Sequence, residues 1–148
     1  MHTVHVSILT SLALIRSING WEEFFGDGNR YLRTASAAFT NRKEIFTPEI
    51  LYNIIAMAIE KFVMAALMHH GTMPYNHTMA DLVEAMEETF PDAIADIREG
   101  LLNLDKYQEI CDPYEFTILP PSRNEIPAML ELARRLQELV KTGLAGKC

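Results

Sequence analysis

One long apolar helix between Thr47 and His70 constrains the fold of this chain more than any other segment. Thr47 can accept a backbone N–H as the N-cap residue, and Pro48 suits the first helical position, where its missing donor costs nothing. Apolar side chains at helical spacing cover most of the circumference. The remaining polar strip is narrow and consists of Glu49, Asn53, Glu60 and Lys61. A helix so apolar must be covered by several neighbours, so we expect it to be the central helix of an all-helical domain.

Three methionines, Met57, Met64 and Met68, lie on the side of this helix where a monomer would normally show polar groups. An apolar stripe there must be shielded from water by another helix or another subunit. Another helix of the same chain would provide this shield, with the thioethers as adaptable core filler, and we favour this interpretation. The alternative is a twofold interface in a homodimer, to which Asn53 and Glu60 would also belong.

Length and composition predict one domain, because 148 residues with 49% hydrophobic content can bury a sizeable core. The 13 basic and 20 acidic residues give a net charge of −7, so contact with nucleic acid would require a local basic patch. Cys111 and Cys148 have no zinc or redox spacing, which fits a reducing, cytoplasmic location. Residues 1–15 lack a basic n-region, and glycine, proline and histidines interrupt the uncharged run 62–80, so we expect neither a signal peptide nor a membrane span.

A first helix is expected before the central one, from the capping-box pattern of Asn19 and Glu22 to about Phe39. Gly26 and Gly28 each cost about 1 kcal/mol relative to alanine, so a break near residues 26–28 is one outcome that the sequence allows. Gly28 is also in register with the apolar positions, which would permit the close approach of another backbone.

Further helices are expected after the central one. Thr78 with Asp81 marks a short helix to about residue 89, a third long helix should span residues 92–110, and Ser122 or Asn124 should cap a last helix that ends at Gly143. The expected fold is therefore an all-α, up-and-down bundle of four or five helices with one short extra helix. It would occupy residues 19–143, between an apolar extension (1–18, strand or helix) and a short tail (144–148).

The order of these elements resembles the HEPN family (higher eukaryotes and prokaryotes nucleotide-binding). The run AMAIEKFVMAALMHHG, with Glu60-Lys61 and Gly71, is similar to the family's central helix, and His77 precedes the short helix TMADLVEAM as in the family. The segment LDKYQEICDPYEF resembles the family's tyrosine- and proline-containing loop before the final helix. The resemblance covers about residues 27–142. It implies a helical bundle, commonly dimeric, of the kind found in prokaryotic toxin–antitoxin, nucleotidyltransferase-partner and RNA-cleaving systems.

Nuclease members of that family carry an arginine, four to six further residues and then a histidine. Neither Arg98 nor Arg123 reaches a histidine at those offsets, and no other arginine does. Without an imidazole near a phosphate-orienting arginine, metal-independent RNA cleavage has no obvious proton shuttle. We therefore expect a non-catalytic interaction or nucleotide-binding module without a cofactor, as the partner of a nucleotidyltransferase or of another RNA-acting protein.

Glu60 is the most distinctive single candidate for a functional or structural site, because it is a carboxylate midway along the most apolar helix. Lys61 points about 100° away from it around the helix and is not its natural partner. We expect the partner to be Arg30 or Arg33 on an adjacent helix. A structural pair is favoured over catalysis, because no second carboxylate has the helical spacing of a dyad.

A set of candidate ligand-binding residues surrounds the loop before the last helix. These residues could form a small basic and aromatic pocket for a nucleotide, the use that the family name suggests. Its members are Arg98, Lys106, Tyr107, Tyr114 and Arg123. In the opposing interpretation the tyrosines only fix the loop to the bundle and the arginines are solvated. The acidic residues in the same region favour that interpretation.

A third set contains the only concentration of metal-type ligands: His69, His70, His77 and Asp81. A metal-dependent hydrolase built on it, or a divergent ribonuclease, is the enzymatic alternative. We favour a structural interpretation, in which His77 fixes the loop and His70 caps the negative end of the central helix. A purely structural oligomerisation domain is the remaining alternative.

Overall fold

The computed structural model describes residues 17–107 and 121–145, and in those ranges the chain is all-helical with no strand. Its α-helices are α2 (Trp21–Asn41), α3 (Pro48–His69), α4 (Met79–Thr89), α5 (Arg98–Asn103) and α6 (Ile126–Ala145). Two short 3-10 helices, η1 (Leu104–Tyr107) and η2 (Arg123–Glu125), flank the segment that leads to α6. Tyr114, Cys111, Cys148 and most of the apolar extension 1–18 lie outside the described residues.

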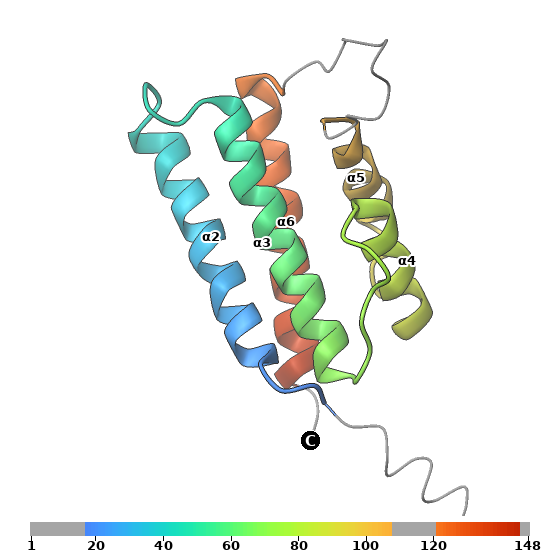
Figure 1. Ribbon diagram of the computed structural model, residues 1–148. Helices are drawn as coiled ribbons and strands as arrows, with labels where there is room; N and C mark the ends of the chain where they lie inside the picture. The colour runs from blue at the N-terminus through green and yellow to red at the C-terminus, as the bar shows by residue number, and fades with distance from the viewer. Residues whose placement is uncertain (1–16, 108–120, 146–148) are drawn as a thin grey trace, which may run out of the picture.

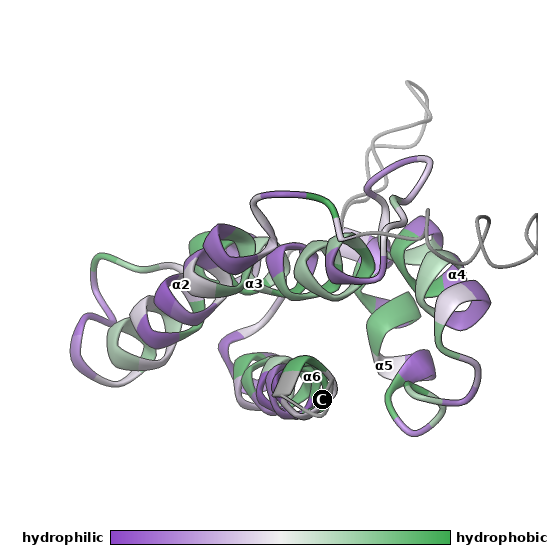
Figure 2. Ribbon diagram, turned by 90° about the horizontal axis from the view of Figure 1, so that it is seen from below, coloured by the Kyte–Doolittle hydropathy of each residue, from purple (hydrophilic) through white to green (hydrophobic). Residues whose placement is uncertain are grey.

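The neighbouring helices α2 and α3 run in opposite directions, whereas α6 runs in the same direction as α3, so the bundle is not strictly up-and-down. In Figure 1 the chain runs up α2, down α3 and, after α4 and α5, down α6. Seen end-on, α2, α3 and α4 lie in one row, and α6 and α5 lie on the same side of that row (Figure 2). Because α3 packs against α2, α4 and α6, it is the central helix that its composition predicts.

The start and the burial of α3 follow from its sequence. The Thr47 hydroxyl accepts from the Ile50 backbone N–H at 3.3 Å, and Pro48 occupies the first turn, as predicted. The helix is long and apolar enough to cross a membrane, and most of it is buried inside the bundle. The core helix of a soluble bundle has the same composition, so this property fits either environment.

The first helix is continuous, and it begins differently from the expected capping box. Gly20 is the N-cap residue of α2, with a φ of 99° and no side-chain cap, so the prediction for Asn19 and Glu22 is wrong. The helix runs through Gly26 and Gly28 without a break. Gly28 is buried against α3, where a Cβ would lie 2.6 Å from Cε1 of Phe62. Gly28 does allow a close approach, but the approaching atoms belong to an aromatic ring of the neighbouring helix and not, as the sequence predicted, to its backbone.

The predicted long helix over residues 92–110 is wrong over its first part. Residues 91–97 form turns, in which Asp92 has a positive φ of 69° and backbone N–H groups bond three residues back, as from Ile97 to Ile94. Only α5 and η1 are helical before the described residues stop at Tyr107. The apolar stripe is correct nevertheless, since each of its members is buried: Ile94, Ile97, Leu101 and Leu104.

The last helix is capped as predicted. The Ser122 backbone N–H donates to the Glu125 carboxylate at 3.1 Å, which completes a capping box at η2, and Pro127 lies in the first turn of α6. The helix continues through Gly143 to Ala145, two residues beyond the expected end. The bundle therefore extends slightly into the range assigned to the tail.

Candidate functional site

Glu60 pairs with a histidine of the loop after α3. Its Oε2 lies 3.2 Å from Nδ1 of His77, and both side chains are partly exposed. The loop runs back alongside α3 toward the start of α4 (Figure 1). The contact with Glu60 places His77 beside the middle of α3. Arg30 pairs with Asp27 one turn away. The expectation that Arg30 or Arg33 would be the partner of Glu60 is therefore wrong.

The methionine stripe on α3 is not a continuous exposed surface. Met64 and Met68 are only 2% and 5% exposed, whereas Met57 is 42% exposed. The backbone N–H of Ile18 donates to the Met68 carbonyl at 2.7 Å, and a Cβ on Gly20 would lie 3.7 Å from the Met68 methyl group. Met64 and Met68 therefore do not belong to a free surface. Met57 remains exposed beside Asn53 on the same helix.

The residues predicted to form a nucleotide pocket around the last loop contact different parts of the bundle instead. Arg98 donates through Nε to Glu87 of α4 at 3.0 Å. Tyr107 donates to Glu125, and Lys106 lies 3.9 Å from the same carboxylate and 4.9 Å from the Tyr107 ring centre. The charges of Arg98 and Lys106 are thus each offset by a carboxylate of the bundle, from Glu87 and Glu125 respectively.

Arg123 holds the connection between α2 and α3. Its Nη2 donates to the carbonyl oxygens of Lys43 and Phe46 at 3.1 and 3.0 Å, and its guanidinium lies over the Phe39 ring. Since Arg98 faces α4 and Arg123 faces this connection, the described members of the set do not converge on one pocket.

The predicted metal ligands also point to separate partners. The His69 ring packs edge-on against Trp21 with ring centres 4.7 Å apart, and the His70 ring packs against Phe90 at 5.2 Å. Asp81 accepts from the hydroxyl of its cap residue, Thr78, at 2.6 Å. Among residues 17–107 and 121–145, no group of three or more histidine, cysteine or acidic side chains is placed to hold a metal ion.

Two sets of polar contacts that the sequence does not predict, one buried and one partly exposed, fix η1 against the bundle. The Tyr52 hydroxyl donates to the Leu104 carbonyl at 2.9 Å. Burial, and then the negative charge of Asp105, raises the pKa of Tyr52 to about 12. The Asp105 carboxylate accepts from the backbone N–H groups of Met79 and Ala80, both at 2.9 Å, and so caps α4 from a distant part of the chain. These contacts stabilise the fold and form no site.

A polar groove of about 540 Å³ lies between α2 and α6. Arg134 donates across it to the Ser36 hydroxyl at 3.2 Å, and Gln137 donates to the Asn29 side-chain oxygen at 2.7 Å. Phe25 and Leu32 supply its apolar part. Its polar lining comes from both helices and consists of Asn29, Arg33, Ser36, Arg134, Gln137, Glu138 and Lys141.

This groove is locally basic in an acidic protein. Its lining holds three cations, Arg33, Arg134 and Lys141, and one carboxylate, Glu138, whereas the whole chain carries −7. Glu131, outside the lining, lies 3.8 Å from Arg134. Arg33 and Lys141 form no ion pair within the described part of the chain. The sequence carries a signal for it, since each helix repeats polar residues at helical spacing beside its apolar stripe: Asn29, Arg33, Ser36, and Arg134, Gln137, Lys141.

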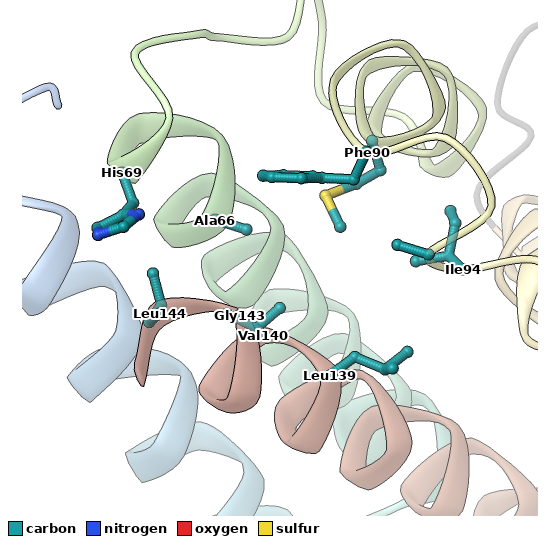
Figure 3. A pocket seen from close by; sticks show the side chains of 10 residues that line it. Ala66, His69, Phe90, Ile94, Leu139, Val140, Gly143 and Leu144 are labelled. Atoms are coloured by element: carbon teal, nitrogen blue, oxygen red, sulfur yellow. The ribbon is translucent and has the colours of Figure 1, made fainter. Parts of the chain in front are cut away.

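A second hollow, of about 170 Å³, is apolar and lies where the ends of α3 and α6 meet the segment after α4 (Figure 3). Its walls include Ala66, Met86, Phe90, Ile94, Leu139 and Val140. His69 lines its edge near Leu144, and Gly143 of α6 completes the lining.

The chemistry that the polar groove offers is anion binding. Guanidinium and ammonium groups suit phosphate oxygens, and the amides can hydrogen-bond to a polar ring. No imidazole lines the groove, and its one hydroxyl, on Ser36, is hydrogen-bonded to Arg134, so its described residues contain no activated nucleophile. No family model, no curated protein and no solved structure matches this chain.

Proposed function

We propose that this protein is a non-catalytic, HEPN-like helical module that binds a nucleotide by its phosphates in the groove between α2 and α6. The observation that carries the proposal is the gathering of Arg33, Arg134 and Lys141 around one hollow of a protein with a net charge of −7. Such a local patch is what an acidic chain requires to hold a phosphate. The order of the helices and the sequence resemblance to HEPN proteins support the same function.

The size and lining of the groove fit a mononucleotide. Its volume of about 540 Å³ lies within the range of small-molecule sites, roughly 300–1,000 Å³. Arginine can hold a phosphate through two parallel hydrogen bonds, and Lys141 adds a point charge. The Phe25 ring is held by Phe62, with ring centres 5.7 Å apart, and offers an apolar surface for a base.

The groove is held in shape without a ligand. The hydrogen bonds from Arg134 to Ser36 and from Gln137 to Asn29 connect the two helices across it. Both helices pack on α3, so the groove residues stand on rigid elements. A preformed site loses less conformational entropy on binding, which favours affinity for a small charged ligand.

The partner and the cellular role follow from the resemblance alone. We propose that the module acts in the cytoplasm beside a nucleotidyltransferase-type or another RNA-acting protein, in a toxin–antitoxin-type system. We also propose a homodimer, for which α3 offers the exposed side chains Ile50, Asn53 and Met57. These positions are three and four residues apart and so share one face of the helix.

Isothermal titration calorimetry with ATP tests the nucleotide proposal. Arg134→Gln removes one groove cation, whereas Arg135→Gln removes the neighbouring cation, which lies near Asp96 at 3.8 Å and does not line the groove. We expect ATP to bind the wild type, Arg134→Gln to weaken it about tenfold, which corresponds to about 1.4 kcal/mol, and Arg135→Gln to change it less than twofold.

Adenosine and inorganic triphosphate serve as the two controls for that titration. Triphosphate should compete with ATP and adenosine alone should bind far more weakly, because the cations supply most of the attraction. Equal losses in Arg134→Gln and Arg135→Gln would contradict the assignment to the groove. No binding of ATP at millimolar concentration would favour a purely structural oligomerisation domain.

A further inference from the structure

We propose that the apolar cavity at the end of the bundle binds a small ligand with one aromatic ring and a single hydrogen-bonding substituent. The cavity lies between α3, the segment after α4 and α6, and is distinct from the polar groove, which is lined by α2 and α6 (Figure 3). The proposal does not depend on nucleotide binding. Three observations carry it: the size of the cavity, a glycine with open space beside it in the lining, and one imidazole at the edge of the cavity.

The volume of about 170 Å³ sets the size of the ligand. An engineered protein cavity of about 150 Å³ with aliphatic and aromatic walls stays free of water and binds benzene. The walls here are of the same kind, with Met86 and Ile94 at the buried side and Phe90 supplying an aromatic face. A single ring with one short substituent fits this space, whereas a nucleotide does not.

Gly143 lines the mouth of the cavity. It continues the inward stripe of α6 after Leu136 and Val140, yet it is exposed, and a Cβ built on it would meet nothing within 4 Å. Its φ is not positive, so its backbone conformation does not require glycine. Glycine weakens a helix relative to alanine. Gly143 therefore leaves space at the entrance, which only a side chain larger than alanine would fill.

Among the described residues that line the cavity, His69 is the only one with a polar side chain. Its ring is held edge-on by Trp21 with ring centres 4.7 Å apart, and Figure 3 shows it at the edge of the cavity, near Leu144. An imidazole nitrogen there can hydrogen-bond to a hydroxyl or carboxylate at the rim while the ring of the ligand fills the apolar interior. The expected ligand class is therefore a phenol or a small aromatic acid.

Calorimetric titration of the full chain with p-cresol, and with toluene as its apolar counterpart, tests the proposal. Both probes should bind the wild type, and p-cresol should bind at least threefold more tightly. In His69→Phe, which keeps an aromatic edge against Trp21, the two probes should bind alike. If His69→Phe leaves the affinity for toluene unchanged but removes the preference for p-cresol, the hydrogen bond to the hydroxyl of p-cresol comes from the imidazole.

Filling variants test the location. Gly143→Ala adds one carbon and should leave the affinity for toluene within about threefold, whereas Gly143→Leu should lower it at least tenfold. Ala93→Leu fills the cavity from the turn after α4 and gives the same expected loss should Gly143→Leu fail to fold. ATP titration of the same variants should remain unchanged, which separates this site from the groove. Absence of binding of both probes by the wild type, or undiminished binding in the filled variants, would overturn the proposal.

Discussion

Gly28 of α2 faces the ring of Phe62 of α3 so closely that a Cβ at residue 28 would lie 2.6 Å from Cε1 and 2.7 Å from Cδ1. Phe62 is fully buried, so its ring cannot move aside without disturbing the core. This contact sets the spacing of the two longest helices. It also places the α2 side of the groove, because Asn29 and Arg33 follow Gly28 on the same helix.

The two glycines of α2 should respond in opposite ways to alanine. We expect Gly28→Ala to lower the free energy of unfolding by about 1–3 kcal/mol, because overpacking against Phe62 outweighs the gain in helix propensity. Gly26→Ala should raise it by up to about 1 kcal/mol, since its Cβ would meet only the end of the Arg30 side chain, at 3.6 Å. Urea unfolding followed by circular dichroism measures both. A stabilised Gly28→Ala variant would show that the helices are not in close contact there.

Tyr52 makes stability depend on alkaline pH. Its pKa is about 12 in the folded protein against 10.0 for an ordinary tyrosine, so the unfolded chain loses this proton first and stability falls as the pH rises from 10 to 12. Below pH 10 this contribution is fully present. Tyr52→Phe removes the hydrogen bond to Leu104 and should cost about 1–3 kcal/mol near neutral pH.

The difference in unfolding free energy between wild type and Tyr52→Phe should shrink across that alkaline range, because only the wild type carries this titrating group. Urea unfolding at several pH values measures it. A difference that stays constant up to pH 12 would mean that the Tyr52 hydroxyl is not buried against η1.

Arg123 should behave as a structural residue. Arg123→Gln removes two hydrogen bonds to the α2–α3 connection, at Lys43 and Phe46, and should lower the free energy of unfolding by about 1–3 kcal/mol. Arg135→Gln is the matched control, because an exposed ion pair contributes about 0–1 kcal/mol. The affinity for ATP should not change in Arg123→Gln. A stable Arg123→Gln variant with impaired ATP binding would restore the loop pocket as the nucleotide site.

The proposed homodimer is tested by light scattering. We expect a mass of twice the 16.8 kDa of one chain, and a return to the mass of one chain in Met57→Lys, which places a charge in the exposed strip of α3. Arg135→Gln, a change of charge on α6 away from this face, is the control and should stay dimeric. A wild-type protein with the mass of one chain at all concentrations would contradict the proposed homodimer.

The elements that the sequence predicts correctly depend on local signals. Thr47, Pro48 and a long apolar run define α3 within one stretch of chain, and Thr78 and Ser122 mark their helices in the same way. The turns at residues 91–97 were not predictable, because the spacing of the buried Ile94 and Ile97 fits both a helix and successive three-residue turns.

Contacts between distant segments could not be read from the sequence. The pairing of Glu60 with His77 depends on the path of a loop, and the burial of Met64 and Met68 depends on what covers α3. Each half of the groove is visible as a polar repeat on its own helix. Only the antiparallel packing of α2 and α6 brings those repeats together, through pairs such as Gln137 and Asn29.

Chemical-shift mapping of the backbone amides during an ATP titration tests nucleotide binding in the groove, because it reports both binding and location. If ATP binds in the groove, saturable shifts will be concentrated on its two polar repeats, at Asn29, Arg33, Ser36, Arg134, Gln137 and Lys141. Shifts centred instead on Arg98, Lys106 and Arg123, or no shifts at millimolar ATP, would contradict nucleotide binding in the groove.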